Sequence, residues 1–285
     1  MKHLILTPNP YRDKNLSCAA QAKEILEKAG IDTVVCLAFD VDKDFALPKT
    51  VDLKELNREL KNSDMLVCFG GDGTLLHASK AATYHGVPVL GVNIGTMGFM
   101  AELEVSEIGQ LANLARQDYR LEERMMLSVS VLRDGVEVLH ENALNDAVIT
   151  KGAVARVIQM DIYCDGIEAI SFSGDGVIVC TPTGSTAYSM SAGGPIVEPV
   201  AENIVVTPVC AHTMLSRPIV TSGSRTIDVL IGRIGRKNAF LSVDGGLAFR
   251  LNTGDTIRIQ RSRYTTKLVR LSNKSFFEIL NKKLK

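Results

Sequence analysis

The chain has 285 residues, of which 46% are apolar, and this length is enough for two domains of ordinary size. Its 32 Lys and Arg residues balance its 32 Asp and Glu residues, so charge gives no reason to expect nucleic acid or an anionic membrane as a partner. The six scattered cysteines include no C-x-x-C pair, which supports neither a zinc site nor a disulfide framework. The apolar start is too short for a signal peptide or a membrane span, and we expect a cytoplasmic protein.

The first part of the chain alternates strand-like and helix-like segments. Short apolar runs predict strands in HLILTPNP, IDTVVCLAF, DMLVCF and VPVLGVN. Apolar residues at helical spacing predict helices at 17–30, 51–63, 75–86 and 105–119. Because such alternation is typical of a parallel sheet with crossover helices, we predict an N-terminal α/β domain with a Rossmann-like sheet over residues 1–121.

The pattern changes near Leu121. Short strands with period-2 alternation follow one another, with turn signals at Asp-Gly pairs 134–135, 165–166 and 175–176. Only residues 189–202 look helical, and their glycines and prolines would keep any helix short. This predicts a C-terminal antiparallel all-β domain over residues 122–267. The last segment, 268–285, contains a predicted helix that we expect to pack back on the N-terminal domain.

A glycine loop follows the strand DMLVCF and consists of Gly70, Gly71, Asp72, Gly73 and Thr74. Glycines let a ligand approach the backbone closely, and the start of the next helix suits phosphate. The loop is neither a Walker A motif nor G-x-G-x-x-G. Asp72 would repel phosphates unless it holds a metal or takes a proton, and both tasks belong to phosphoryl transfer. The alternative, a tight turn in which Asp72 caps the helix, is equally compatible with the loop alone.

A second glycine-rich segment, residues 91–99, follows the next predicted strand. In a parallel sheet both loops emerge at the carboxyl ends of their strands, where ligands bind. Phe99 would then offer an aromatic face to a base, or it would belong to the core.

Two polar segments in the second half are further candidates. Asn145 and Asp146 interrupt an apolar run, and their side chains suit ribose hydroxyls, although a hairpin turn is the better account of this pair alone. Residues 173–195 place many hydroxyls and glycines around Tyr188 directly after a buried strand. This favours a ligand loop over a flexible linker.

GGDGT at 70–74, Asn-Asp at 145–146 and TPTGSTAYSMSAGGPIV at 181–197 together closely resemble the ATP-dependent NAD kinases of bacteria. The resemblance extends from Met65 to about Val220 and continues weakly through LSVDGG at 241–246. GGDGT is shared with diacylglycerol and sphingosine-type lipid kinases and, loosely, with 6-phosphofructokinases. The T-P-T-G-S-T-A-Y stretch separates NAD kinases from those relatives.

The resemblance implies an α/β domain and a β-rich domain with the dinucleotide between them, and it assigns roles to single residues. Asp72 is expected to accept the proton of the 2′-hydroxyl of the adenosine ribose, with Gly73 against the same ligand. Asn145 and Asp146 match a pair that holds the adenine end and the ribose, although most members have Asn-Glu there. The other expected NAD-binding residues are His77, Phe99, Arg156, Ser173, Asp175, Thr186, Ala187, Tyr188, Ser189, Met190, Ser191 and Cys210.

The implied reaction is phosphoryl transfer from ATP to NAD, which gives ADP and NADP. A divalent ion, Mg²⁺, is expected to be held mainly through the nucleotide phosphates, with no protein metal site. The resemblance also favours a homodimer or homotetramer. Two alternatives stay open: a lipid or sugar kinase that shares GGDGT, and a non-catalytic dinucleotide sensor. Donor range, the choice between NAD and NADH, and feedback by NADP(H) are also open.

Overall fold

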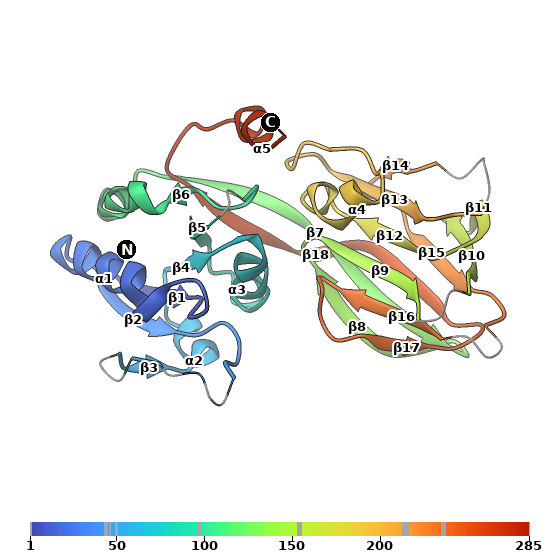
Figure 1. Ribbon diagram of the computed structural model, residues 1–285, viewed down its shortest axis with the longest axis horizontal. Coiled ribbons are helices and arrows are strands. Elements are labelled where there is room, and N and C mark those ends of the chain that lie inside the picture. The colour runs from blue at the N-terminus through green and yellow to red at the C-terminus, as the bar shows by residue number, and fades with distance from the viewer. Residues whose placement is uncertain are drawn as a thin grey trace. The chain divides into compact units, whose positions relative to one another are not determined.

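The computed structural model describes residues 2–42, 45, 47–48, 51–95, 98–152, 156–212, 217–234 and 238–284. The chain forms two compact units (Figure 1). The first unit is Met1–Glu123 with Thr266–Lys285, and the second is Arg124–Thr265. The domains predicted at 1–121, 122–267 and 268–285 stay a prediction, because compactness does not show that a part folds by itself.

The first unit contains a parallel sheet with the strand order β5-β4-β1-β2-β3. Strand β6 and the last residues of β18 also pair with β5 in parallel. These strands are β1 (His3–Pro8), β2 (Asp32–Cys36), β3 (Leu53–Lys54), β4 (Met65–Gly70), β5 (Val89–Asn93), β6 (Leu103–Glu104) and β18 (Thr256–Arg270). The helices are η1 (Lys14–Leu16), α1 (Ser17–Lys28), α2 (Leu56–Leu60), α3 (Asp72–Tyr84), η2 (Val105–Arg116) and α5 (Phe276–Lys283). The predicted α/β fold is confirmed.

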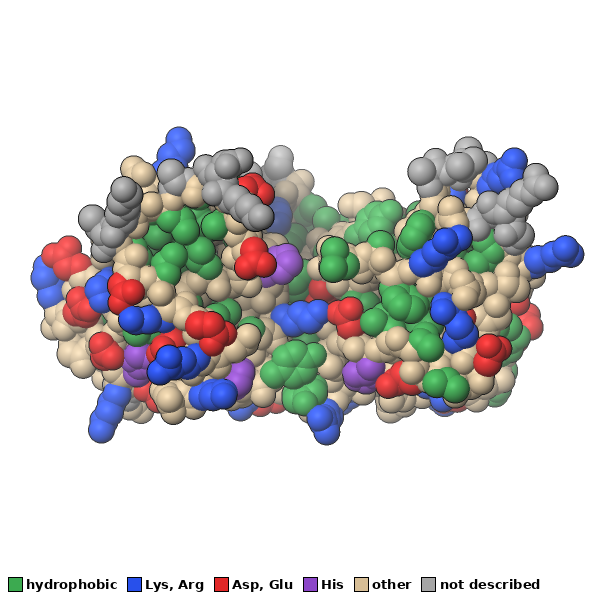
Figure 2. All heavy atoms as spheres, turned by 90° about the horizontal axis from the view of Figure 1, so that it is seen from below, with side chains coloured by type: hydrophobic (Ala, Val, Ile, Leu, Met, Phe, Trp, Pro, Cys, Tyr) green, Lys and Arg blue, Asp and Glu red, His purple; other side chains and the backbone are tan. Residues whose placement is uncertain are grey.

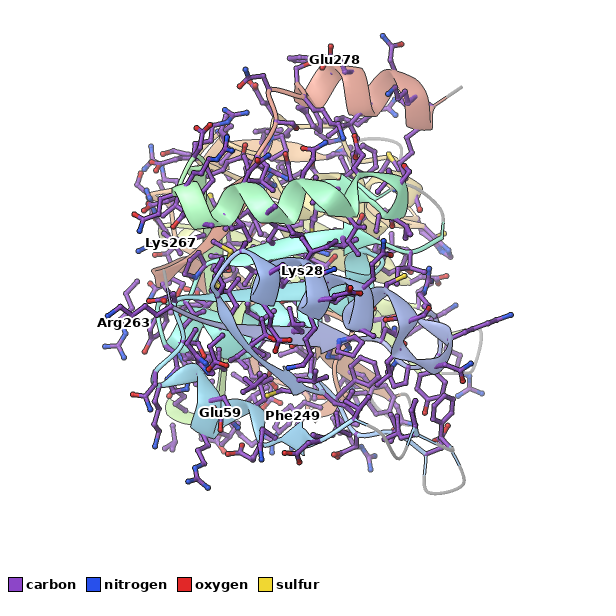
Figure 3. All side chains as sticks on the ribbon, turned by 90° about the vertical axis from the view of Figure 1, so that its left-hand side faces the viewer. Lys28, Glu59, Phe249, Arg263, Lys267 and Glu278 are labelled. Carbon is purple, nitrogen blue, oxygen red and sulfur yellow. The ribbon has the colours of Figure 1, made fainter. Side chains whose placement is uncertain are left out.

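The residue types of this unit explain its buried strands and the bounds of helix α1. Strands β4 and β5 are buried at every position, as expected of parallel strands covered on both faces. Helix α1 begins where the buried Asp13 carboxylate accepts hydrogen bonds from the N–H groups of Cys18 and Ala19. The helix packs beside η2 (Figure 3). It ends before Gly30, whose φ of +81° requires a residue without a side chain.

Two predicted helices differ from those observed. The helix predicted at 51–63 is reduced to α2, because β3 occupies Leu53–Lys54 and the Glu55 side chain caps the helix start at the N–H groups of Asn57 and Arg58. The helix predicted at 105–119 is η2, a 3-10 helix that begins with a capping box between Glu104 and Glu107.

The second unit is built from antiparallel strands in two sheets, which confirms the predicted all-β fold. One sheet has the order β14-β13-β12-β9-β16-β17. In the other, β11-β10-β15-β18 is extended by β7, which pairs with β18 and β8. The strands are β7 (Arg120–Arg133), β8 (Val136–Ala143), β9 (Asp146–Lys151), β10 (Ile158–Cys164), β11 (Ile167–Gly174), β12 (Gly176–Cys180), β13 (Asn203–Val209), β14 (Ile219–Ser222), β15 (Ile227–Ile231), β16 (Ala239–Val243) and β17 (Phe249–Leu251). Aliphatic side chains from both sheets form one core.

Two of the three predicted Asp-Gly turns are hairpin turns. The turn at residues 134–135 joins β7 to β8, and the turn at residues 165–166 joins β10 to β11. All four turn residues have positive φ values, as such hairpin turns require. The hairpin turn predicted at Asp175–Gly176 is wrong, because Gly176 is the first residue of β12 and the chain there passes from one sheet to the other. A Cβ at Gly176 would overlap the carbonyl oxygen of Ile149 on the paired strand, so close packing explains this glycine.

Charged side chains of both signs are interspersed over the face seen in Figure 2, in line with the balanced composition. Ion pairs at the surface of the protein include Arg225 with Asp165 and Arg261 with Glu202. None of the helices in the described ranges is long and apolar enough to span a membrane.

Candidate functional site

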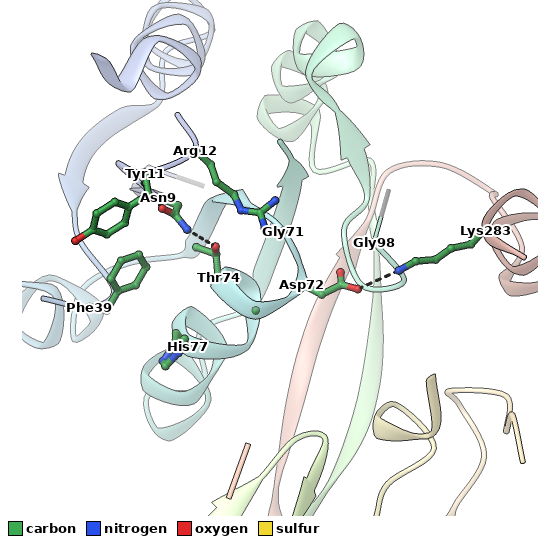
Figure 4. A pocket seen from close by; sticks show the side chains of 11 residues that line it. Asn9, Tyr11, Arg12, Phe39, Gly71, Asp72, Thr74, His77, Gly98 and Lys283 are labelled. Carbon is green, nitrogen blue, oxygen red and sulfur yellow. Dashed lines mark hydrogen bonds and ion pairs between the residues drawn. The ribbon is translucent and has the colours of Figure 1, made fainter. Parts of the chain in front are cut away.

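The first unit has a pocket of about 460 Å³ at the carboxyl ends of its parallel strands (Figure 4). Ligands bind at this edge in open α/β sheets. The lining residues come from the segments after β1, β2, β4 and β5, from α3 and from α5. They are Asn9, Tyr11, Arg12, Phe39, Gly71, Asp72, Gly73, Thr74, His77, Gly98 and Lys283.

Asp72 is the first residue of α3, and its carboxylate reaches across to the loop after β5. Oδ2 accepts a hydrogen bond from the N–H of Phe99 (2.8 Å), and Oδ1 accepts one from the N–H of Met100 (3.1 Å). A Cβ at Gly98 would overlap this carboxylate, so the glycine leaves room for it. The helix-capping alternative is wrong, because the N-cap residue is Gly71 and no side chain caps α3.

Two cations line this end of the pocket, and one of them lies next to the Asp72 carboxylate. Lys283 Nζ lies 3.9 Å from Asp72 Oδ2. Arg12 Nη1 donates to the carbonyl oxygen of Ile94 (3.2 Å), and its guanidinium lies against Gly71. The first turn of α3 adds N–H groups that have no acceptor within the helix, together with the positive end of the helix dipole. This end of the pocket therefore suits an anion such as phosphate.

The predicted phosphate loop divides into three positions that line the pocket and one that lies in the interior. Gly71, Gly73 and Thr74 line the pocket, whereas Gly70 is buried in β4. A Cβ at Gly70 would overlap the Thr74 side chain. The Thr74 hydroxyl accepts a hydrogen bond from Asn9 Nδ2 (2.8 Å), and Asn9 Oδ1 accepts one from the N–H of Tyr11 (3.0 Å). These bonds fix the turn after β1 against the start of α3.

Two other predicted residues of this unit have different surroundings. His77 is exposed on α3 and lines the pocket, with its ring centroid 6.0 Å from that of Phe39. The Phe99 ring is buried next to α5, 6.3 Å from the ring of Phe276 and 4.1 Å from Lys283 Nζ. This structure supports the core interpretation of Phe99, and the prediction that its face meets a base lacks support here.

The sequence reasoning missed Asn9, Tyr11, Arg12, Phe39 and Lys283. The first four follow β1 and β2, and the rule that ligands bind after parallel strands was available to find them. Lys283 had no comparable signal, because its place depends on how α5 packs.

In the second unit, the segment of Asn145 and Asp146 joins strands of different sheets, since β8 pairs with β7 and β9 pairs with β12 and β16. The hairpin alternative is therefore wrong. The Asp244 carboxylate holds this segment by accepting from the N–H groups of Leu144 (2.7 Å), Asn145 (2.8 Å) and Asp146 (3.1 Å). The sequence reasoning also missed Asp244, although it stands in the LSVDGG stretch.

Both side chains of this pair bring polar atoms into a buried place. Asn145 Oδ1 is buried and accepts no hydrogen bond from any residue that the structure describes. Asp146 is only 5% exposed. Burial raises the pKa of Asp146 to about 7, and the nearby Asp244 carboxylate adds to the rise. A ligand with hydroxyl or amino donors would satisfy both groups.

The TPTG stretch packs directly on this pair. The Thr181 hydroxyl donates to the carbonyl oxygen of Leu144 (2.6 Å), and the Thr181 N–H donates to that of Asn145 (2.9 Å). A Cβ at Gly184 would overlap the backbone of Asn145. The structure thus brings together two motifs that lie far apart in the sequence.

Most hydroxyls of the following loop are used inside the protein. Thr186 donates to the Thr183 carbonyl (3.2 Å), and the buried Ser189 shares a hydrogen bond with Thr207 (2.8 Å). The loop forms the short helices η3 (Gly184–Thr186) and α4 (Tyr188–Ser191), so the flexible-linker alternative is wrong. The remaining positions differ in exposure: Ala187 and Met190 are half-buried, and Tyr188 and Ser191 are exposed.

Three of the remaining predicted residues lie close together. Asp175, directly before β12, forms an ion pair with Lys151 (2.6 Å). The carbonyl oxygen of Ser173 accepts a hydrogen bond from the N–H of His212 (2.8 Å). Cys210, two residues before His212, is exposed and has a φ of +47°. Arg156 is exposed immediately before β10.

Nowhere in the described part of the chain do three or more His, Cys, Asp or Glu side chains come together as a metal site. Within the pocket, Asp72 supplies a carboxylate, which is a ligand type that Mg²⁺ prefers alongside substrate phosphates.

Comparisons with known proteins agree with one another. Residues 4–119 match the ATP-NAD kinase N-terminal domain, and residues 144–271 match the ATP-NAD kinase C-terminal domain. The NAD kinase of Ruminiclostridium cellulolyticum is 36% identical over 286 residues, which cover 100% of this chain and 98% of that protein. The NAD kinase of Geotalea daltonii is 43% identical over 226 residues, or 79% of each chain.

Solved structures give the same result. A yeast NADH kinase complexed with NADH has a TM-score of 0.86 and 26% identity, covering 100% of this chain and 87% of that one. An NAD kinase from Archaeoglobus fulgidus in complex with ATP has a TM-score of 0.73 and 25% identity, covering 100% and 98%. This chain belongs to the NAD kinase family.

Proposed function

We propose that this chain transfers the terminal phosphoryl group of ATP to the 2′-hydroxyl of the adenosine ribose of NAD, giving NADP and ADP. Membership of the family supports the reaction. The observation that carries the proposal is the position of the Asp72 carboxylate, at the start of α3 and in the pocket, next to Lys283.

The pocket residues have complementary tasks in this proposal. The first turn of α3, Arg12 and Lys283 bind the phosphates of ATP, since they supply N–H donors and positive charge. Asp72 accepts the proton of the ribose hydroxyl. Each of its oxygens accepts one backbone hydrogen bond, and a carboxylate has room for about four, so it can stay in place and still accept a hydroxyl.

The second unit supplies groups that recognise the dinucleotide. Asn145 Oδ1 accepts from the adenine amino group or a ribose hydroxyl, and Asp146 accepts from a ribose hydroxyl. Asp146 is one methylene shorter than the Glu that the sequence resemblance leads us to expect, and its position at the start of β9 sets its reach. The other proposed NAD contacts are Gly73, His77, Arg156, Ser173, Asp175, Thr186, Ala187, Tyr188, Ser189, Met190, Ser191 and Cys210.

Mg²⁺ fits this pocket as an ion held mainly by nucleotide phosphates, with Asp72 as the carboxylate within reach. When bound, it would neutralise charge on the triphosphate. We also propose the homodimer or homotetramer that the sequence resemblance favours, and light scattering on purified protein would test that assembly.

The deciding experiment is a coupled assay with purified protein, NAD, ATP and Mg²⁺, read through an NADP-specific dehydrogenase. The wild-type protein should form NADP from NAD and ATP. When NAD is replaced by diacylglycerol or fructose 6-phosphate, it should release no ADP from ATP. Asp72→Asn should lower kcat about 10²–10⁴-fold and leave NAD binding by calorimetry nearly unchanged. Asp118→Asn, at an exposed position of the same unit, is the matched control.

Near-normal turnover by Asp72→Asn would show that this carboxylate is not the base. Dinucleotide binding without NADP formation by wild type would overturn the proposal in favour of a sensor.

A further inference from the structure

The pocket next to Asp72 has a second, aromatic end. Tyr11 and Phe39 lie on one side of Thr74, and Asp72 and Lys283 lie on the other (Figure 4). His77 lines the aromatic end from α3. One pocket thus joins an anion-binding end to an end walled by rings.

The rings at this end are held in place and yet remain accessible. Tyr11 and Phe39 are nearly parallel, with an interplanar angle of 9° and centroids 6.4 Å apart, and Phe45 meets Tyr11 edge-on at 4.8 Å. The Tyr11 hydroxyl donates to Asp42 Oδ2 (2.9 Å) and accepts the Asp42 N–H (2.9 Å). Tyr11 is nevertheless 47% exposed. A fixed, half-exposed ring in a polar pocket is suited to stack on a flat ligand.

The charges along the pocket distinguish between two classes of phosphoryl donor. The cations that line it, Arg12 and Lys283, lie with the first turn of α3. Around Tyr11 and Phe39, the described residues offer aromatic faces, the Asp42 carboxylate and one imidazole, that of His77. A chain of inorganic phosphates would gain little there, because each phosphate needs a cation or N–H donors. A purine would gain stacking, which every base face allows.

The direction in which the pocket extends from Asp72 also agrees with a nucleotide as the donor. In the proposed reaction the terminal phosphoryl group lies near Asp72, which accepts the proton of the attacking hydroxyl. The remainder of the donor must then extend away from Asp72, and in Figure 4 the aromatic end lies in that direction. A volume of about 460 Å³ is within the usual range for pockets that bind small molecules.

We propose that Tyr11 and Phe39 form the base subsite for the phosphoryl donor, so that the donor is a purine nucleoside triphosphate and not an inorganic polyphosphate. This inference rests on the proposed function and specifies the donor for the same site. In this assignment the two rings contribute to the affinity for ATP, and other residues determine the affinity for NAD.

The test compares two donors in Tyr11→Leu and Phe39→Leu. We expect KM for ATP to rise about 5-fold to 100-fold in both variants, whereas KM for NAD stays within about twofold. The inhibition constant of inorganic tripolyphosphate against ATP should not change, because that probe has no base. Tyr11→Phe keeps the ring and should recover most of the affinity. Tyr84→Leu removes a tyrosine of similar exposure (46%) from the far end of α3 and should have no effect.

Several results would overturn the assignment. One is an ATP KM that changes less than twofold in Tyr11→Leu, and another is an equal loss for ATP and tripolyphosphate, which would mean that the rings only shape the loop. A rise in KM for NAD alone would place the rings in the acceptor site. If wild type forms no NADP, the proposed function fails separately, and calorimetry with a non-hydrolysable ATP analogue on wild type and Tyr11→Leu still decides the base subsite.

Discussion

Replacement of Asp146 by Asn should make the protein more stable at alkaline pH. Asp146 is only 5% exposed, it faces the charge of Asp244, and its pKa is raised from an ordinary value of 3.8 to about 7. Above pH 7 the native protein therefore carries a buried carboxylate that the unfolded chain would keep in water. Asn has nearly the same shape and no charge, so the variant avoids this cost.

The size and sign of the effect follow from the linkage between proton binding and folding. A carboxyl group whose pKa is raised by folding binds more protons in the native state between about pH 4 and pH 7, so wild type loses stability as pH rises through this range. At about 1.4 kcal/mol per pH unit, the full loss is about 4 kcal/mol. Of this, between about 2 and 3 kcal/mol falls between pH 5 and pH 8, and the loss is nearly constant above pH 8, where the group is fully ionised in both states.

The assay is urea denaturation of wild type and Asp146→Asn at pH 5 and pH 8. The free energy of unfolding of the variant relative to wild type should increase by about 2–3 kcal/mol between these two pH values, with similar m-values. Asp118→Asn, at an exposed position, should show no such trend. Parallel pH profiles for wild type and Asp146→Asn would refute the raised pKa and its assignment to burial.

Three further changes test other contacts. Gly98→Ala places a methyl group where the Asp72 carboxylate lies, and it should lower kcat at least tenfold in the coupled assay without loss of NAD affinity by calorimetry. Arg270→Ala leaves the buried Glu102 without its ion-pair partner and should cost about 3–5 kcal/mol in urea denaturation; a loss below about 1 kcal/mol would contradict a buried pair. Thr181→Val removes the hydroxyl that anchors the turn before β9 and should cost about 1–3 kcal/mol, measured in the same way.

The sequence predicted the class of each unit because local patterns determine it. Buried runs alternating with helices give β4 and β5 of the parallel sheet, and Asp-Gly pairs give the turns at 134–135 and 165–166. The same dipeptide at 175–176 misled, because its conformation depends on the strand packed against Gly176 and not on its own residue types. The helix predicted at 51–63 was too long for a related reason, since a short strand pairs with β2 within it.

The candidate site was predictable where it lies in one motif and unpredictable where it depends on tertiary packing. Asp72 was identified because glycines and a following helix surround it in sequence. Its actual hydrogen-bond donors, the N–H groups of Phe99 and Met100, belong to a different loop. Lys283 comes from the opposite end of the chain, and its position depends on the packing of α5 near Phe99.

In the proposed function, buried polar groups of the second unit give a physical reason for a ligand to bind there. Asn145 Oδ1 is buried without a donor in the described part of the chain, and Asp146 is buried near a like charge. A protein core normally satisfies a buried amide oxygen, and one left unsatisfied costs about 1–3 kcal/mol. Thr181, Gly184 and Asp244 hold the backbone of this segment, so it cannot relax to satisfy them itself. In the proposed function, a ligand that brings hydroxyl and amino donors would satisfy Asn145 Oδ1 and donate to Asp146, and this would turn a local loss of stability into binding affinity for a ribose and its base.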